Sequence, residues 1–138
     1  MNKIEKIYNI IKNRMSGYIA PIKVYKNTHT LLKAYCKIDH KNYYKIVNYY
    51  TEYFKSHRYM NTKYAGRNKK NCDAFDIVAL ATNPISISGN RMLKKNKAKI
   101  AFALLHEIGH YKVGDNEIAA DKFAIRWIRT LKKEKLIE

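Results

Sequence analysis

The sequence predicts an α+β domain in which a small sheet or hairpin packs with about four helices, one of them central. Three observations support this prediction. Ile4, Ile7, Ile11 and Met15 recur at helical spacing, short β-rich segments lie between turn residues, and a later helical segment is apolar on almost every side. The 138 residues are 46% hydrophobic, which suffices for one modest core, so we expect residues 1–138 to form a single domain.

The N-terminal part of the chain alternates between helical and extended patterns. The first helix is expected to end before Gly17, which follows the last residue of the apolar stripe. Pro21 then precedes residues 22–26, whose alternation of apolar and polar side chains is typical of a half-buried strand. Residues 28–39 are compatible with either a helix or a strand.

The middle of the chain contains one further helix and a candidate hairpin. Apolar side chains with helical spacing predict a helix from Lys41 to about Arg58. Residues 59–72, which include Gly66 and several basic residues, are expected to form a loop. Phe75–Ala81 and Ile85–Ser88 are short and β-rich, with Asn83-Pro84 between them and Gly89-Asn90 after them. This arrangement favours a β-hairpin.

The last two helices are expected to be adjacent. Asn96 is a plausible N-cap for a helix that runs to about Lys112, with Gly114 as its stop. Between Ile100 and Ile108 this helix is apolar nearly all round, so it should be central in the fold. Asp115 or Asn116 would cap the final helix, which ends in a basic tail.

Charge and apolar runs limit the classes of protein to consider. The 28 Lys and Arg against 11 Asp and Glu give a formal net charge of +17, which favours an anionic partner: nucleic acid, an acidic protein face or an anionic membrane surface. The alternative is compositional, because an A+T-rich genome also produces many Lys, Asn, Ile and Tyr. The longest apolar runs, Ile77–Ala81 and Ile100–Leu105, are far shorter than the roughly 20 residues of a membrane span.

The N-terminus and the two cysteines point to a cytoplasmic protein. The N-terminus lacks the apolar core of a secretion signal. Cys36 and Cys72 have no metal-binding spacing and are interpreted as reduced, buried thiols.

His106-Glu107-Ile108-Gly109-His110 is an HExxH sequence within the predicted central helix. Histidines at i and i+4 lie on one helical face, so both imidazoles can reach one metal ion. Glu107 is placed beside such an ion rather than among its ligands, where its carboxylate can take a proton from an attacking water. Two surface histidines would be the simple alternative, but the helix is too apolar to present a solvated face.

The remaining ligand is expected at the start of the final helix. Glu117 and Asp121 are also i and i+4, and their face continues as apolar residues, so it should point inward. Buried carboxylates are costly unless paired. We therefore interpret Glu117 as the third ligand of a catalytic Zn²⁺, which takes three protein ligands, and Asp121 as the group that orients a ligating histidine, most simply His106.

These segments resemble known metallopeptidases. HExxH followed by NExxxD is the gluzincin arrangement, and residues 102–110 and 117–124 look like the ImmA/IrrE-type zinc metallopeptidases of phages and mobile elements. The resemblance covers roughly residues 75–131, and the segment between His110 and Glu117 is shorter than is usual in that family. It implies a zincin-like fold, zinc on His106, His110 and Glu117, Glu107 as general base, and regulatory proteolysis of a protein substrate, often a DNA-binding repressor.

The sequence thus favours zinc-dependent hydrolysis of a peptide bond, with Glu107 transferring a proton from water to the leaving amine. Candidate groups for stabilising the oxyanion are Tyr111, His29, His40 and His57.

Two other functions stay open. In one, a basic nucleic-acid-binding or regulatory protein carries a structural metal; its support is the basic clusters Lys63–Lys70, Lys94–Lys99 and Lys132–Lys135, with possible base-stacking residues Tyr43, Tyr44, Tyr49, Tyr50, Tyr53, Tyr59 and Tyr64. In the other, a zincin-like interaction protein has lost its activity, which the presence of Glu107 argues against.

Overall fold

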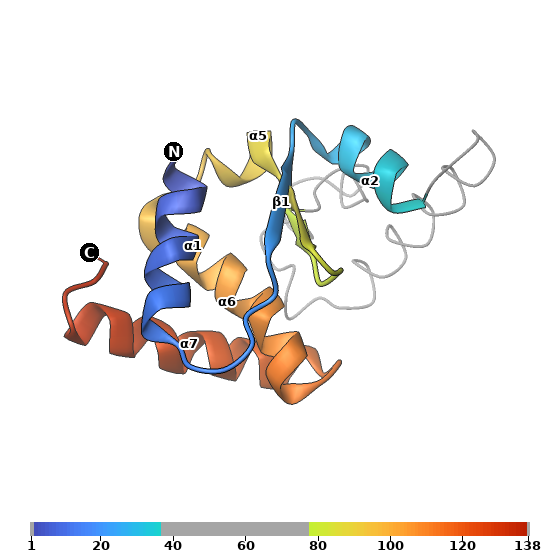
Figure 1. Ribbon diagram of the computed structural model, residues 1–138. Coiled ribbons are helices and arrows are strands. Elements are labelled where there is room, and N and C mark those ends of the chain that lie inside the picture. The colour runs from blue at the N-terminus through green and yellow to red at the C-terminus, as the bar shows by residue number, and fades with distance from the viewer. Residues whose placement is uncertain (1, 37–77, 138) are drawn as a thin grey trace, which may run out of the picture.

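A computed structural model describes residues 2–36 and 78–137, and the architecture below concerns those residues (Figure 1). They form an α+β fold, as the sequence predicts. Three strands make one sheet in the order β1-β3-β2: β1 (Ile22–Tyr25), β2 (Ala79–Leu80) and β3 (Ile85–Ser88). β2 and β3 are antiparallel, which confirms the predicted hairpin, whereas β1 lies parallel to β3 with Ile22 beside Ile85.

One segment differs from the expected pattern, and another settles a prediction that the sequence left open. Gly89–Met92 is a short helix, α5, where the sequence predicts a turn. The Asn90 backbone N–H donates to the Lys26 carbonyl at 3.2 Å, and a Cβ at Gly89 would lie 2.8 Å from the Tyr25 carbonyl oxygen, so the chain turns tightly around the end of β1. Thr28–Cys36 forms a helix, α2, which resolves the ambiguity over that segment.

Some sequence predictions lie outside the described residues. These are the helix over 41–58, the loop over 59–72, the first part of the strand predicted from residue 75, and the side chains of Cys36 and Cys72.

The N-terminal helix packs against the central one. In α1 (Lys3–Arg14) the Asn2 side chain accepts a hydrogen bond from the Glu5 N–H at 2.9 Å and so caps the first turn. Ile4, Ile7 and Ile11 are buried on one face, as their spacing predicts, and α1 contacts α6.

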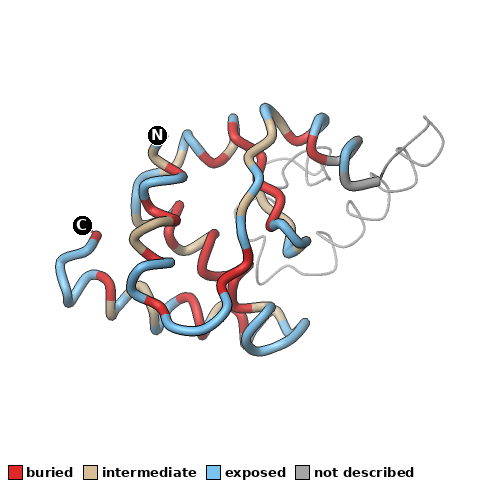
Figure 2. Tube along the Cα trace, in the orientation of Figure 1, coloured by how far each residue is buried: buried red, intermediate tan, exposed pale blue. Residues whose placement is uncertain are grey.

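The central helix, α6 (Lys97–Val113), contacts α1, α7 and β2. Asn96 caps its first turn, and its ends match the sequence prediction closely. Figure 2 shows buried positions concentrated where α6 passes between its neighbours. The core there includes Ile85, Ile87, Ile100, Leu104, Leu105 and Ile108, all at most 1% exposed.

The last helix, α7 (Glu117–Lys133), returns along α6 after a short turn. Its N-cap is Asn116, whose side chain accepts from the Ala119 N–H at 2.9 Å. The two helices approach closely because Gly109 has no side chain: a Cβ there would lie 3.0 Å from a ring carbon of Phe123 and 3.4 Å from the Ala120 backbone. Of the described helices, none is long and apolar enough to cross a membrane.

The turn between α6 and α7 depends on Gly114. Its backbone has φ 91° and ψ −165°, a conformation that is strained for any L-residue, and a Cβ there would meet no atom within 4 Å. Gly114→Ala therefore introduces backbone strain without a clash, and we expect it to lower the free energy of unfolding by about 1–3 kcal/mol. Urea denaturation measures this, with Asp115→Ala as the exposed neighbouring control. An unchanged denaturation midpoint in Gly114→Ala would contradict the role given to this turn.

Candidate metal centre

The two histidines of the HExxH sequence lie one turn apart on α6 and face the same space. Their Nε2 atoms are 3.2 Å apart, and the rings meet edge to face with centroids separated by 4.8 Å. The His106 side chain is 9% exposed and that of His110 11%. Phe102, one turn before His106, stacks against its ring at 6.5 Å between centroids and limits where that imidazole can lie.

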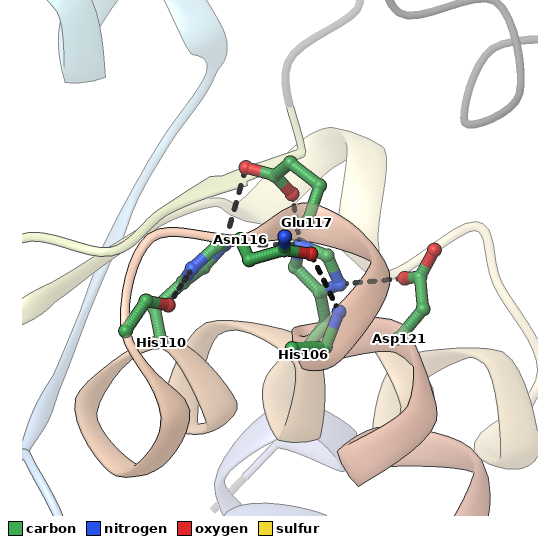
Figure 3. Close-up of polar contacts among 7 residues, drawn as sticks. His106, His110, Asn116, Glu117 and Asp121 are labelled. Atoms are coloured by element: carbon green, nitrogen blue, oxygen red, sulfur yellow. Dashed lines mark hydrogen bonds and ion pairs between the residues drawn. The ribbon is translucent and has the colours of Figure 1, made fainter.

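Glu117, the first residue of α7, reaches between these two imidazoles (Figure 3). One carboxylate oxygen lies 2.8 Å from the His106 Nε2 and the other 3.2 Å from the His110 Nε2. The structure thus brings together the three predicted ligands, with all their ligand atoms within 4.8 Å of one another.

The second nitrogen of each imidazole is held by a hydrogen-bond acceptor. Nδ1 of His106 lies 2.7 Å from Asp121, which sits on the side of His106 away from His110 (Figure 3). Nδ1 of His110 lies 2.9 Å from the Gly114 carbonyl oxygen, which can only accept. Both Nδ1 atoms therefore donate, which leaves the Nε2 lone pairs directed at the shared space when the rings are neutral.

This donor set suits a metal ion. Two imidazole nitrogens and one carboxylate oxygen are the ligands of many catalytic zinc sites, which leave a fourth position open. Ligand atoms around a tetrahedral zinc ion are about 3.3 Å apart, given bond lengths near 2.0–2.1 Å. The 3.2 Å separations here match that value, and the 2.8 Å contact between His106 and Glu117 needs to lengthen only slightly.

Without a metal, protons take the place of the cation. The hydrogen bond that His110 donates to the Glu117 carboxylate raises the pKa of His110 to about 9, despite the opposing effect of burial. Burial also lowers the pKa of His106, but the hydrogen bond with Glu117 and the charges of the nearby carboxylates outweigh it, so the pKa is raised overall. The centre is thus arranged to hold positive charge between its carboxylates.

Glu107 is close enough to the ligand residues for their charges to influence it. The pKa of Glu107 is raised to about 7: burial is the largest cause, the two imidazoles oppose it, and the negative charge of Glu117 adds to it. Its position one residue after His106 keeps it out of the converging set of three ligand atoms.

The candidates for an oxyanion donor are only partly placed. The Tyr111 hydroxyl donates to the Thr82 carbonyl, so it ties α6 to the turn after β2. Burial, followed by the nearby Tyr18 and Glu107, raises the pKa of Tyr111. His29 is exposed on α2, which packs against the sheet, and His40 and His57 lie outside the described residues.

Sequence reasoning missed three contributors to the centre. Gly114 was expected only as a helix stop, yet its carbonyl holds His110; Gly109 allows the close packing of α7; and Phe102 stacks on His106. The first had a recognisable signal, since the carbonyl four residues after a histidine in the last helical turn is without a partner within the helix.

Asp121→Asn tests the orienting contact. The variant keeps the size of the side chain but removes the charge that faces the His106 Nδ1–H, so we expect metal affinity to fall roughly 10–100-fold with the fold intact. Competition with a zinc chelator measures this affinity. Asp115→Asn, in the exposed turn before α7, is the matched control, and equal affinities in the two variants would show that Asp121 does not support a ligand.

Metal affinity should also depend on pH, because metal and protons compete for the same nitrogen atoms. Because the pKa of His110 is raised to about 9, His110 is protonated at pH 7 in the metal-free protein, so binding must release a proton and affinity should increase from pH 6 to pH 8. Calorimetry in two buffers of different ionisation enthalpy counts the released protons. Flat affinity with no proton release would contradict the protonated metal-free state.

No family model, curated protein or solved structure matches this chain. The resemblance to ImmA/IrrE-type metallopeptidases therefore rests on the HExxH and ExxxD residues themselves.

Proposed function

We propose that this protein is a zinc-dependent metallopeptidase with a zincin-like domain, in which His106, His110 and Glu117 hold the metal. One observation carries the proposal: two Nε2 atoms and the Glu117 carboxylate converge, while each Nδ1 is fixed by a separate acceptor. A histidine pair that merely stabilised the helix contact would not need both rings oriented in this way.

The proposed reaction is hydrolysis of a peptide bond. Bound zinc would supply a Lewis acid that acidifies a water molecule and polarises a carbonyl. Glu107, beside the ligands, accepts the proton of the attacking water and passes it to the leaving amine. Asp121 keeps the His106 ring in the orientation and tautomer that ligation requires.

An extended peptide is a reasonable substrate for this geometry. β2 lies at the end of the strand order among the described strands and contacts α6, the helix that carries both histidines. Peptides commonly bind by adding to the edge of a sheet, which would place a backbone beside this helix. By the family resemblance we propose a cytoplasmic protein substrate, with a DNA-binding repressor as the first candidate.

The main alternative is a basic regulatory protein in which the same three ligands hold a structural metal. Structural zinc sites usually have four protein ligands, whereas three are found together here within the described residues. This difference favours the catalytic role.

Glu107→Gln separates the two functions. Gln is nearly isosteric, so we expect about one zinc per chain to stay bound, while hydrolysis falls at least 10²–10⁴-fold because an amide cannot accept the proton. Metal analysis and cleavage of a mixture of internally quenched peptides by the zinc-loaded protein are the measurements. Asp115→Asn serves as the control for loss of one surface carboxylate.

Three results would contradict parts of the proposal. A lack of zinc after reconstitution of the folded protein would remove the metal centre. Undiminished hydrolysis by the Gln variant would remove Glu107 as general base. The structural metal would be favoured if the wild-type protein binds zinc but cleaves none of the peptides, and if Glu107→Gln leaves its biological effect unchanged.

A further inference from the structure

The exposed residues of α7 all lie on one side of the helix. At 100° per residue they fall within an arc about 120° wide, opposite the buried face. Five of these side chains are cationic and two are apolar: Lys122, Arg126, Arg129, Lys132 and Lys133, with Ile118 and Ile125. We call this surface the α7 outer face. Figure 1 shows α7 along one side of the molecule, with α6 next to it.

The acidic residues of this helix do not neutralise the outer face. Glu117 and Asp121 turn toward the histidines. Glu134, directly after α7, makes a bidentate ion pair with Arg14 at 2.6 and 2.8 Å, and its charge also acts on Lys133. Within the part of the chain that the structure describes, the charges of Lys122, Arg126, Arg129 and Lys132 are therefore available to a partner.

The outer face offers hydrogen-bond donors without acceptors. Lysine and arginine side chains only donate, and the apolar residues among them do neither. Arg126 lies over the Phe123 ring at 5.9 Å, which helps to hold its guanidinium in place. A complementary surface must therefore present acceptors alone, over the roughly 16 Å between Lys122 and Lys133.

The phosphate backbone of nucleic acid meets this requirement uniformly. A duplex carries one negative charge per about 1.7 Å of its axis, and phosphate oxygens only accept. A membrane fits less well, because the apolar face of α7 that would insert into it is buried against the protein: Ala120, Phe123, Ala124 and Leu131. An acidic protein would need an equally long row of carboxylates without donors.

We propose that the α7 outer face binds the phosphate backbone of a nucleic-acid duplex without reading its sequence. None of its seven exposed residues is Asn, Gln, Asp or Glu, the side chains that read adenine and cytosine edges, so a guanine contact is the one common base-specific pairing open to its cations. The outer face is also separate from the basic segment 94–99, because the two meet opposite ends of α1. Lys3, at the start of α1, donates to the Lys95 carbonyl, whereas Arg14, at the end of α1, contacts Glu134 directly after α7. The proposal does not depend on catalysis at the metal centre.

The test compares two variants of the full chain that lose the same number of charges. Lys122→Gln/Arg126→Gln/Arg129→Gln alters the outer face, and Lys94→Gln/Lys97→Gln/Lys99→Gln alters exposed lysines elsewhere. Fluorescence anisotropy measures binding of a labelled duplex DNA of random sequence between 50 and 300 mM salt. Thermal melting by circular dichroism checks that both variants fold.

We expect the outer-face variant to bind roughly tenfold or more weakly and its salt slope to fall by about 2–3, since each lost phosphate contact removes about 0.9. The control variant should bind nearly as the wild type does. Equal weakening in both variants would show that net charge alone governs binding, and absence of duplex binding at 50 mM salt would exclude the proposal.

Two further probes distinguish other partners. Vesicles with phosphatidylserine test a membrane, with Ile118→Ser/Ile125→Ser as the variant that removes the apolar side chains. Poly-glutamate tests an acidic protein. Stronger binding to the vesicles than to the duplex, lost in Ile118→Ser/Ile125→Ser, would overturn the assignment to nucleic acid. Stronger binding to poly-glutamate than to the duplex, lost in Lys122→Gln/Arg126→Gln/Arg129→Gln, would also overturn it. Weaker binding to both probes supports it.

Discussion

The close packing of α6 on α7 at Gly109 is the constraint on which the candidate centre depends. Gly109 lies between the two histidines, and its partner Ala120 lies between Glu117 and Asp121. Because the contact point is central to all four residues, the separation of the helices there sets the distances between the carboxylates of α7 and the imidazoles of α6. A larger residue at either position would move the carboxylates as one body away from the imidazoles, and contacts of 2.7–3.2 Å would be lost together.

The parts of the fold that the sequence predicts are those with a local physical cause. The stripe of Ile4, Ile7 and Ile11 identifies a helix because burial follows the helical period. Asn96 marks the start of α6 because its side chain accepts a hydrogen bond from the backbone N–H three residues later. The pairing of His106 with Asp121 could be expected for a similar reason. Each is on a face fixed by helical geometry, and a short turn leaves few ways for the two helices to meet.

The remaining features depend on contacts between distant segments. The parallel pairing of β1 with β3 joins residues about sixty positions apart, and no local pattern reports such a pairing. The α7 outer face was also missed as a unit, because its cations alternate in sequence with buried residues, whereas the run Lys132–Lys135 is visible as a cluster. The need for a glycine at position 89 is equally invisible in the sequence, because the atom that a Cβ there would meet is the carbonyl oxygen of Tyr25 in β1.

α7 carries opposite charges on adjacent faces, and this explains how a chain of net charge +17 can keep a centre suited to a cation. The carboxylates of Glu117 and Asp121 lie within 2.8 Å of His106, so their effect there is direct and little screened. The outer-face cations lie farther round the helix from the imidazoles and extend into solvent, where the Debye length is about 8 Å at physiological ionic strength. Their repulsion at the centre is therefore weak compared with the attraction of the nearby carboxylates. One helix can thus serve a metal on its inner side and an anionic polymer on its outer side, with neither charge pattern cancelling the other.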